Sequence, residues 1–226
     1  MKRLTKRQVG EILVIPICTI IVLFLVIDST TNFPWEIPQH SFSWTVAEGD
    51  EFVFNTTVDG QYNYTPFIPD ELLVVVNTSI RVKIESLPDC SIESEQGFIS
   101  LINTVKVSST FLNGTDLPFD TCSSLNALVS RSILPTGGWE YIDWLYPDNK
   151  DDDAARNGWV IDSYLSKSQE ESFYFGYYYC YVDCGNSWGA YISTTTGFPQ
   201  SIHTGSFAAS SPNPYSWTII LSRVQI

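Results

Sequence analysis

The sequence begins with a short basic segment that is followed by an apolar run without a single charge. Residues 1–8 carry four Lys and Arg side chains, and the run from Ile12 to Ile27, ILVIPICTIIVLFLVI, has 16 residues. Folded as a helix, this run would be roughly 24 Å long, compared with about 30 Å for the hydrocarbon core of a bilayer. The pattern is typical of a secretory signal or an N-terminal signal anchor, and either one places the rest of the chain outside the cytoplasm.

The residues after the run favour an anchor over a cleaved signal. A cleavage site needs small residues in an A-x-A-like pattern, and no alanine occurs between Val26 and Thr31. Phe33 and Trp35 lie where interfacial aromatic side chains are common. We therefore expect a cytoplasmic flank at 1–8, a single transmembrane helix at 9–27 that holds the protein in the membrane, a spacer at 28–41 and one extracellular domain at 42–226. Secretion after signal cleavage is the alternative.

The charge of the chain divides at the end of the apolar run. The chain has 12 basic and 25 acidic side chains, for a net charge of -13. Residues 1–27 contribute 4 − 1 = +3, which leaves 8 − 24 = −16 for residues 28–226. Such an acidic exported part would repel phosphates, so we expect no nucleic-acid partner. With 44% apolar and only 16% charged residues, the chain is also too hydrophobic to be disordered.

Four cysteines lie in the part that is predicted to be exported. An even number of cysteines outside the cytoplasm suggests two disulfides, for which three pairings exist. We favour Cys180–Cys184, which are close in sequence at a strand end, together with Cys90–Cys122. A zinc site is the alternative, but the C-x3-C spacing and the lack of a nearby histidine argue against it. We expect no cofactor.

Four N-x-[ST] sequons, at Asn55, Asn63, Asn77 and Asn113, are candidate glycosylation sites in an exported chain. The proline at position 66, directly after the Asn63 sequon, makes that sequon the weakest. The alternative interpretation is that these residues are ordinary turn and strand residues.

Hydrophobic periodicity predicts strands in the first and last parts of the exported region and short helices between them. The predicted strands cover 42–46, 51–58, 72–85, 98–112, 172–182, 188–196, 200–208 and 215–226, with turns that include 59–60 and 184–186. The predicted helices cover 122–133, 139–146 and 151–158. This order indicates a single α+β domain, mainly antiparallel β, in which a large curved sheet carries two or three short helices and follows one N-terminal transmembrane helix.

Four segments together resemble exported proteins of Asgard-type archaea. The segments are WTVAEGDEF at 44–52, IRVKIESLP at 80–88, ILPTGGWEYIDWLYPD at 133–148 and AYISTTTGFPQSI at 190–202. Proteins of that group are membrane-anchored β-rich ectodomains that begin with W-x-V-x-x-G-D-x-F. The resemblance covers most of 42–226, and it implies a fold and a location but no activity.

An acidic cluster is the first candidate site. Asp148, Asp151, Asp152 and Asp153 offer the oxygen ligands that calcium prefers, although their spacing is not that of an EF-hand. The alternative interpretation is a helix N-terminus that acidic side chains stabilise. We therefore expect no strong metal site.

The aromatic strand at 172–182 is the second candidate site. Alternation places its side chains on two faces of the sheet, and one face of a curved sheet can line an apolar or sugar-binding groove. The candidate groove residues are Tyr174, Phe175, Tyr177, Tyr178, Tyr179 and, in the next strand, Trp188. The alternative is that both faces pack against other parts of the domain.

The sequence contains no G-x-S-x-G or H-E-x-x-H motif, and we assign no catalytic residue. His203, in a late strand, is interpreted as structural. We expect a binding or interaction module at the cell surface whose partner is a protein or a glycan. The alternatives are a carrier or sensor of a lipid-like ligand and a surface glycan hydrolase.

Overall fold

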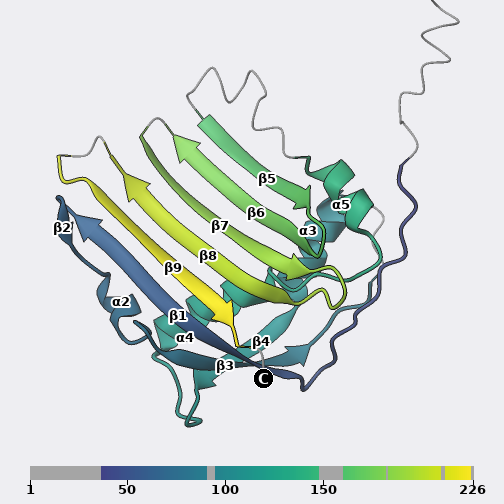
Figure 1. The fold of residues 1–226 in the computed structure, drawn as a ribbon, viewed down its shortest axis with the longest axis horizontal. Coiled ribbons are helices and arrows are strands. Elements are labelled where there is room, and N and C mark those ends of the chain that lie inside the picture. Colours follow the sequence, from purple (N-terminus) through teal and green to yellow (C-terminus); the bar gives the residue numbers. More distant parts are fainter. Residues whose placement is uncertain (1–36, 91–94, 148–159, 182, 210–211, 225–226) are drawn as a thin grey trace, which may run out of the picture. The chain divides into compact units, whose positions relative to one another are not determined.

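The computed structural model describes residues 37–90, 95–147, 160–181, 183–209 and 212–224 (Figure 1). The chain divides into a unit of residues 1–37 and a unit of residues 38–226, and the described residues belong almost entirely to the second unit. The predicted anchor, most of the spacer and the acidic cluster lie outside the described residues. Among the described residues, no helix combines the length and the apolar character that a membrane crossing requires.

The described residues of the second unit form one antiparallel sheet of nine strands (Figure 1). The strands are β1 (Glu51–Tyr62), β2 (Thr65–Pro66), β3 (Ser79–Ser86), β4 (Lys106–Phe111), β5 (Val160–Ser168), β6 (Ser172–Tyr181), β7 (Cys184–Ser193), β8 (Pro199–Ala208) and β9 (Tyr215–Arg223). Their order across the sheet is β4-β3-β1-β9-β8-β7-β6-β5, and β2 pairs with β1 beside this path. The last strand therefore joins the early strands to the late ones, since β9 pairs with both β1 and β8.

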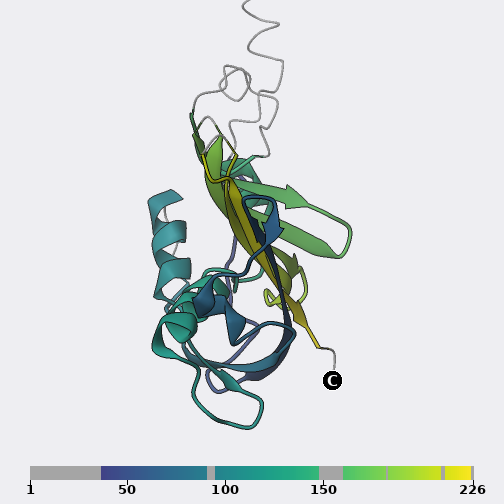
Figure 2. The same ribbon diagram turned by 90° about the vertical axis from the view of Figure 1, so that its left-hand side faces the viewer.

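The described part contains four short helices, which form a layer beside the sheet. They are α2 (Asp70–Leu73), α3 (Glu95–Thr104), α4 (Phe119–Ser130) and α5 (Trp139–Leu145). α4 packs on β4 and β8, whereas α5 packs on β5. Figure 2 shows these helices on one side of the sheet, which we call the helix face, and we call the other side the open face. The predicted class, mainly antiparallel β with a large sheet and short helices, is confirmed.

The centre of the core is a row of side chains that crosses the helix face. Antiparallel register brings together Ser166, Phe175, Ala190, Ile202, Leu221 and Thr56, each at most 1% exposed. Phe175 contacts the rings of Phe98 and Tyr146, so the row joins the sheet to the helical layer. The buried Ser166 hydroxyl lies 2.9 Å from the Tyr146 carbonyl oxygen and 2.9 Å from Asp143 Oδ1, which satisfies its hydrogen bonding.

Two predicted strands begin later than expected because helices precede them. The first half of the predicted strand 98–112 forms α3, and only its second half forms β4. Phe98, Leu101 and Ile102 have the three- and four-residue spacing of a helix face, and all three are buried. Similarly, the predicted strand 72–85 begins with the end of α2, and β3 follows only after a loop.

The predicted turn at Asp59 and Gly60 is wrong. β1 continues through both residues because β9 pairs with it as far as Tyr62. The chain turns instead at Asn63 and Tyr64, whose φ angles of 47° and 64° lie in the left-handed region. An Asp-Gly pair predicts a hairpin turn where the chain leaves one strand and enters the next, but here both residues lie within β1.

One strand was not predicted and two boundaries differ. The helix-face residues of β5 include Ser166, which interrupts apolar alternation, so the sequence gives β5 no strand pattern. The predicted turn at 184–186 lies inside β7. The predicted strand 42–46 is reduced to an isolated bridge between Ser43 and Thr136. The helices predicted at 122–133 and 139–146 correspond to α4 and α5, and the predicted helix at 151–158 lies outside the described residues.

Truncation of the central core side chain should strongly destabilise the fold. We expect Phe175→Ala to lower the free energy of unfolding by about 3–5 kcal/mol, since a fully buried ring is replaced by a cavity. The measurement is urea denaturation followed by fluorescence. Tyr181→Ala, on the same strand but 51% exposed, is the control and should cost much less. Equal losses for the two variants would contradict the assignment of Phe175 to the core.

Candidate functional site

The structure divides the predicted groove residues between the two faces of the sheet. Phe175, Tyr177, Tyr179 and Trp188 lie on the helix face, and Tyr174 and Tyr178 lie on the open face. Phe175 is fully buried, and Trp188 is nearly so. The six residues therefore do not line one groove, and each face has to be considered separately.

On the open face, the side chain of Tyr174 lies flat across two glycines. Gly176 of β6 and Gly189 of β7 are register partners, and neither has a side chain to lift the ring from the sheet. A Cβ atom at Gly189 would lie 2.7 Å from Tyr174 Cζ and 2.8 Å from His203 Cε1, which is closer than such atoms approach. The glycine pair thus makes room for two rings on the sheet surface.

Tyr174 reaches across β7 to His203 of β8. The Tyr174 hydroxyl and His203 Nε2 are 3.4 Å apart, within hydrogen-bond distance, and the two rings are stacked at 5.9 Å between centroids. Tyr191 of β7 packs edge-on against Tyr174, with 5.1 Å between the ring centroids. We call Tyr174, Tyr191 and His203 the aromatic patch, and Tyr191 is its most exposed member at 38%.

Polar side chains continue from the aromatic patch across the open face. Register pairs Tyr191 with Ser201, Ser201 with Ser222 and Ser222 with Asn55. This row crosses from β7 to β1, and each strand contributes one hydroxyl or amide side chain to it. The patch therefore combines flat aromatic faces with neutral hydrogen-bonding groups.

Burial among these rings lowers the pKa of His203. The imidazole is therefore neutral near neutral pH and can either donate to or accept from the Tyr174 hydroxyl. A neutral ring keeps the aromatic patch free of charge.

The depressed pKa of His203 predicts a loss of stability in acid. An unfolded histidine titrates near pH 6.5, so the unfolded state binds the proton more tightly than the folded state. The contribution of the neutral His203 to the stability of the fold is therefore present above about pH 6.5. It is lost as the pH falls through the lower pKa that His203 has in the folded state.

Thermal unfolding between pH 7.5 and 5 measures this effect. We expect the melting temperature of the wild type to fall more than that of His203→Gln over this range. His40→Gln, which removes the other histidine of the chain, is the control. Its melting temperature should fall between pH 7.5 and 5 by as much as that of the wild type. Parallel curves for the wild type and His203→Gln would contradict the prediction.

On the helix face, Arg131 lies at the end of α4 and over the ring of Trp188. Its Cζ atom is 4.5 Å from the centroid of the Trp188 ring, a cation–π contact. Its Nε is buried and has no hydrogen-bond partner among the described residues. Burial lowers the pKa of the guanidinium, and Tyr164 interacts with it electrostatically in the opposite direction.

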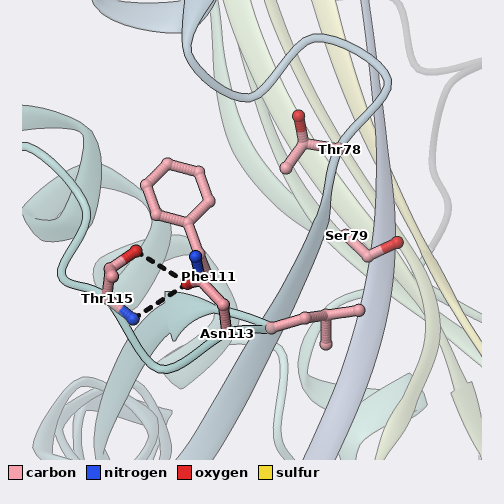
Figure 3. Close-up of a pocket in the computed structure, with 6 residues that line it drawn as sticks. Thr78, Ser79, Phe111, Asn113 and Thr115 are labelled. Carbon is pink, nitrogen blue, oxygen red and sulfur yellow. Dashed lines mark hydrogen bonds between the residues drawn. The ribbon is translucent and has the colours of Figure 1, made fainter.

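A shallow hollow lies at the opposite end of the sheet, beside the start of β3 and the end of β4 (Figure 3). It has a volume of about 540 Å³, and its lining is Thr78, Ser79, Phe111, Leu112, Asn113 and Thr115. Asn113 Oδ1 accepts hydrogen bonds from the Thr115 backbone N–H and hydroxyl, at 3.0 and 2.7 Å. The hollow contains residues of two predicted sequons, so we do not favour it as a ligand site.

None of the cysteines at 90, 122, 180 and 184 is in a disulfide in this structure. Cys180 pairs in register with Gly185, and Cys184 pairs with Tyr181, so Cys180 and Cys184 point to opposite faces of the β6–β7 hairpin. A bond between them would require the end of the hairpin to rearrange. Cys122 donates to the Ser109 carbonyl oxygen at 3.6 Å. Both disulfides remain predictions for the oxidised protein.

The sequon asparagines Asn55, Asn63, Asn77 and Asn113 are all exposed, and their glycosylation remains a prediction. The four aspartates of the calcium candidate lie outside the described residues. Elsewhere in the described ranges, no group of three His, Cys, Asp or Glu residues is placed to hold a metal ion.

Sequence reasoning missed Tyr191 and Arg131 and treated His203 as structural. The glycines at 176 and 189 were the available signal for the aromatic patch, because glycine inside a strand often marks the close approach of another group. Arg131 carried a weaker signal, as one of only eight basic residues after position 27.

Comparison with known proteins gives no relative. No protein-family model, no curated protein and no solved structure matches the chain.

Proposed function

We propose that the chain is a membrane-anchored extracellular binding module that binds neutral glycans on the open face of its sheet. The observation that supports this proposal best is the aromatic patch, in which Tyr174 and His203 lie flat over a glycine pair beside the exposed ring of Tyr191. The predicted N-terminal anchor supplies the location.

The chemistry of the aromatic patch suits sugar rings. A pyranose has an apolar face of C–H groups that packs on an aromatic ring, and its hydroxyls form hydrogen bonds at the edge. Tyrosine offers both a flat ring and a polar hydroxyl. The adjacent row of Ser201, Ser222 and Asn55 adds donors and acceptors at the strand spacing of about 4.8 Å.

The charge of the exported part indicates which glycans fit. With −16 on residues 28–226, an acidic glycan would be repelled at long range, whereas a neutral one would not. The aromatic patch itself contains no acidic or permanently basic side chain, and the exposed Lys167 of β5, which pairs in register with Tyr174, is a charged neighbour at its edge. A neutral oligosaccharide is therefore the ligand we expect.

The two alternatives have less support. A carrier of lipid-like ligands needs an open apolar cavity, but Phe173 and Phe175 fill the helix face and are fully buried. A glycan hydrolase needs a carboxylic acid with a raised pKa. At Glu85, hydrogen bonding from the Ser108 hydroxyl lowers the pKa of the carboxyl group, the opposite of what an acid catalyst needs.

A glycan array tests the binding proposal. We expect the full chain, in a detergent without a sugar headgroup, to bind one or more neutral oligosaccharides, and Tyr191→Ala to weaken binding at least about tenfold. Production without N-glycosylation keeps sugar off Asn55, which lies in the same polar row.

Tyr215→Ala is the matched control for the array. Tyr215 is 37% exposed, almost the same as Tyr191, but it lies on the helix face, so its loss should leave binding unchanged. Failure of the wild type to bind any neutral glycan, or equal binding by Tyr191→Ala, would refute the proposal.

Alkaline extraction tests the anchor. Washed membranes treated with carbonate should keep the full chain in the pellet, because a transmembrane helix is held by its apolar surface and not by charge. A variant that lacks residues 1–27 is the control and should not pellet. Release of the full chain into the supernatant would show that residues 9–27 do not anchor it.

A further inference from the structure

Arg131 differs from the two basic residues that form ion pairs in the described part of the chain. Arg81 pairs with Glu51 at 3.4 Å and Lys83 with Glu85 at 3.6 Å, and both of these pairs are solvent-exposed. Arg131 is half-buried with a fully buried Nε atom, and no carboxylate among the described residues lies within ion-pair distance. In a region with three times as many acidic as basic residues, an arginine without a carboxylate is unexpected.

The described surroundings of Arg131 offset only part of the free-energy cost of burying its charge. Burying a hydrogen-bond donor without a partner is unfavourable, and more so when the group is charged. The Trp188 ring below the guanidinium recovers part of this through the cation–π contact. Its position after the last turn of α4 also places the positive charge near the negative end of the helix dipole. Neither contact provides an acceptor for Nε.

The side chains beside Arg131 and Trp188 are less buried than the centre of the core. Trp188 belongs to a cross-strand row with Tyr164, Tyr177 and Thr204, which are half-buried. The next row toward the β6–β7 turn contains an exposed Asn186 and half-buried aromatic and hydroxyl side chains. Arg131 therefore lies between the packed core and a part of the helix face that the described residues bury only partly.

We propose that Arg131 anchors a binding site for a small organic carboxylate with a flat apolar body. The guanidinium would bind the carboxylate, and the flat body would lie against the half-buried rings of Tyr164 and Tyr177. A guanidinium matches the planar, two-oxygen geometry of a carboxylate, and such charge-assisted bonds are about twice as strong as neutral ones. The net charge of −16 favours a monoanion over a dianion such as phosphate. The site is on the opposite face from the aromatic patch and does not depend on the glycan proposal.

Benzoate is the probe, and titration calorimetry of the full chain in detergent is the measurement. We expect saturable binding of benzoate and at least tenfold weaker binding of benzamide, which has the same ring without the charge. Arg131→Gln should weaken benzoate binding at least tenfold. Arg131→Lys should also weaken it, since an ammonium cannot form the paired hydrogen bonds.

Arg223→Gln is the matched control. Arg223 also lies over aromatic rings, at 5.0 Å from the centroid of Phe52 and 5.2 Å from that of Phe198, but at the other end of the helix face. Its loss, like Tyr191→Ala, should leave benzoate binding unchanged. Near-ultraviolet circular dichroism checks that each variant is folded. If Arg131→Gln does not fold, benzoate binding by Arg131→Lys is compared with that of the wild type instead. Absence of saturable benzoate binding by the wild type, or wild-type affinity in the Arg131 variants, would overturn the proposal.

Discussion

The backbone register of β6, β7 and β8 is the constraint on which the rest of the structure depends. Alternate residues of a strand point to opposite faces, so the pairing places Phe175, Ala190 and Ile202 in the core. The same pairing places the glycine pair and His203 on the open face. A slip of one residue would exchange these two sets and remove both the core and the aromatic patch. The large apolar burial on one face therefore also determines the chemistry of the other face.

The two surfaces acquire their character in different ways. On the open face, two glycines without side chains leave room for the Tyr174 ring to lie against the sheet and contact His203. The helix face is shaped by incomplete cover, since α4 ends where Arg131 reaches over Trp188. At this position a charged group is partly desolvated without a carboxylate partner among the described residues. Both are places where local preference and the global fold do not fully agree, and such places are often functional.

Much of the fold could be predicted from the sequence. The strands after position 170 have clear alternation, and α4 and α5 have helical spacing and a proline after each, so their local patterns agree with their tertiary contacts. Prediction failed where the pattern was ambiguous or where tertiary pairing overrode it. Short apolar runs fit a helix or a strand equally well, as α3 shows. The β9 ladder extended β1 through an Asp-Gly pair, and the buried Ser166 concealed β5 because its hydrogen-bond partners are distant in sequence.

The candidate sites show the same difference between local sequence patterns and tertiary contacts. The sequence by itself determined the charge division, the apolar N-terminal run, the α+β class and the alternation of the aromatic strand, because each is a property of neighbouring residues. Only the tertiary structure decided which aromatic residues meet. Tyr174, Tyr191 and His203 come from three strands, and Arg131 lies more than fifty residues before Trp188 in the chain. Their contacts depend on strand register and on where a helix ends above the sheet, and no local sequence pattern encodes either of these.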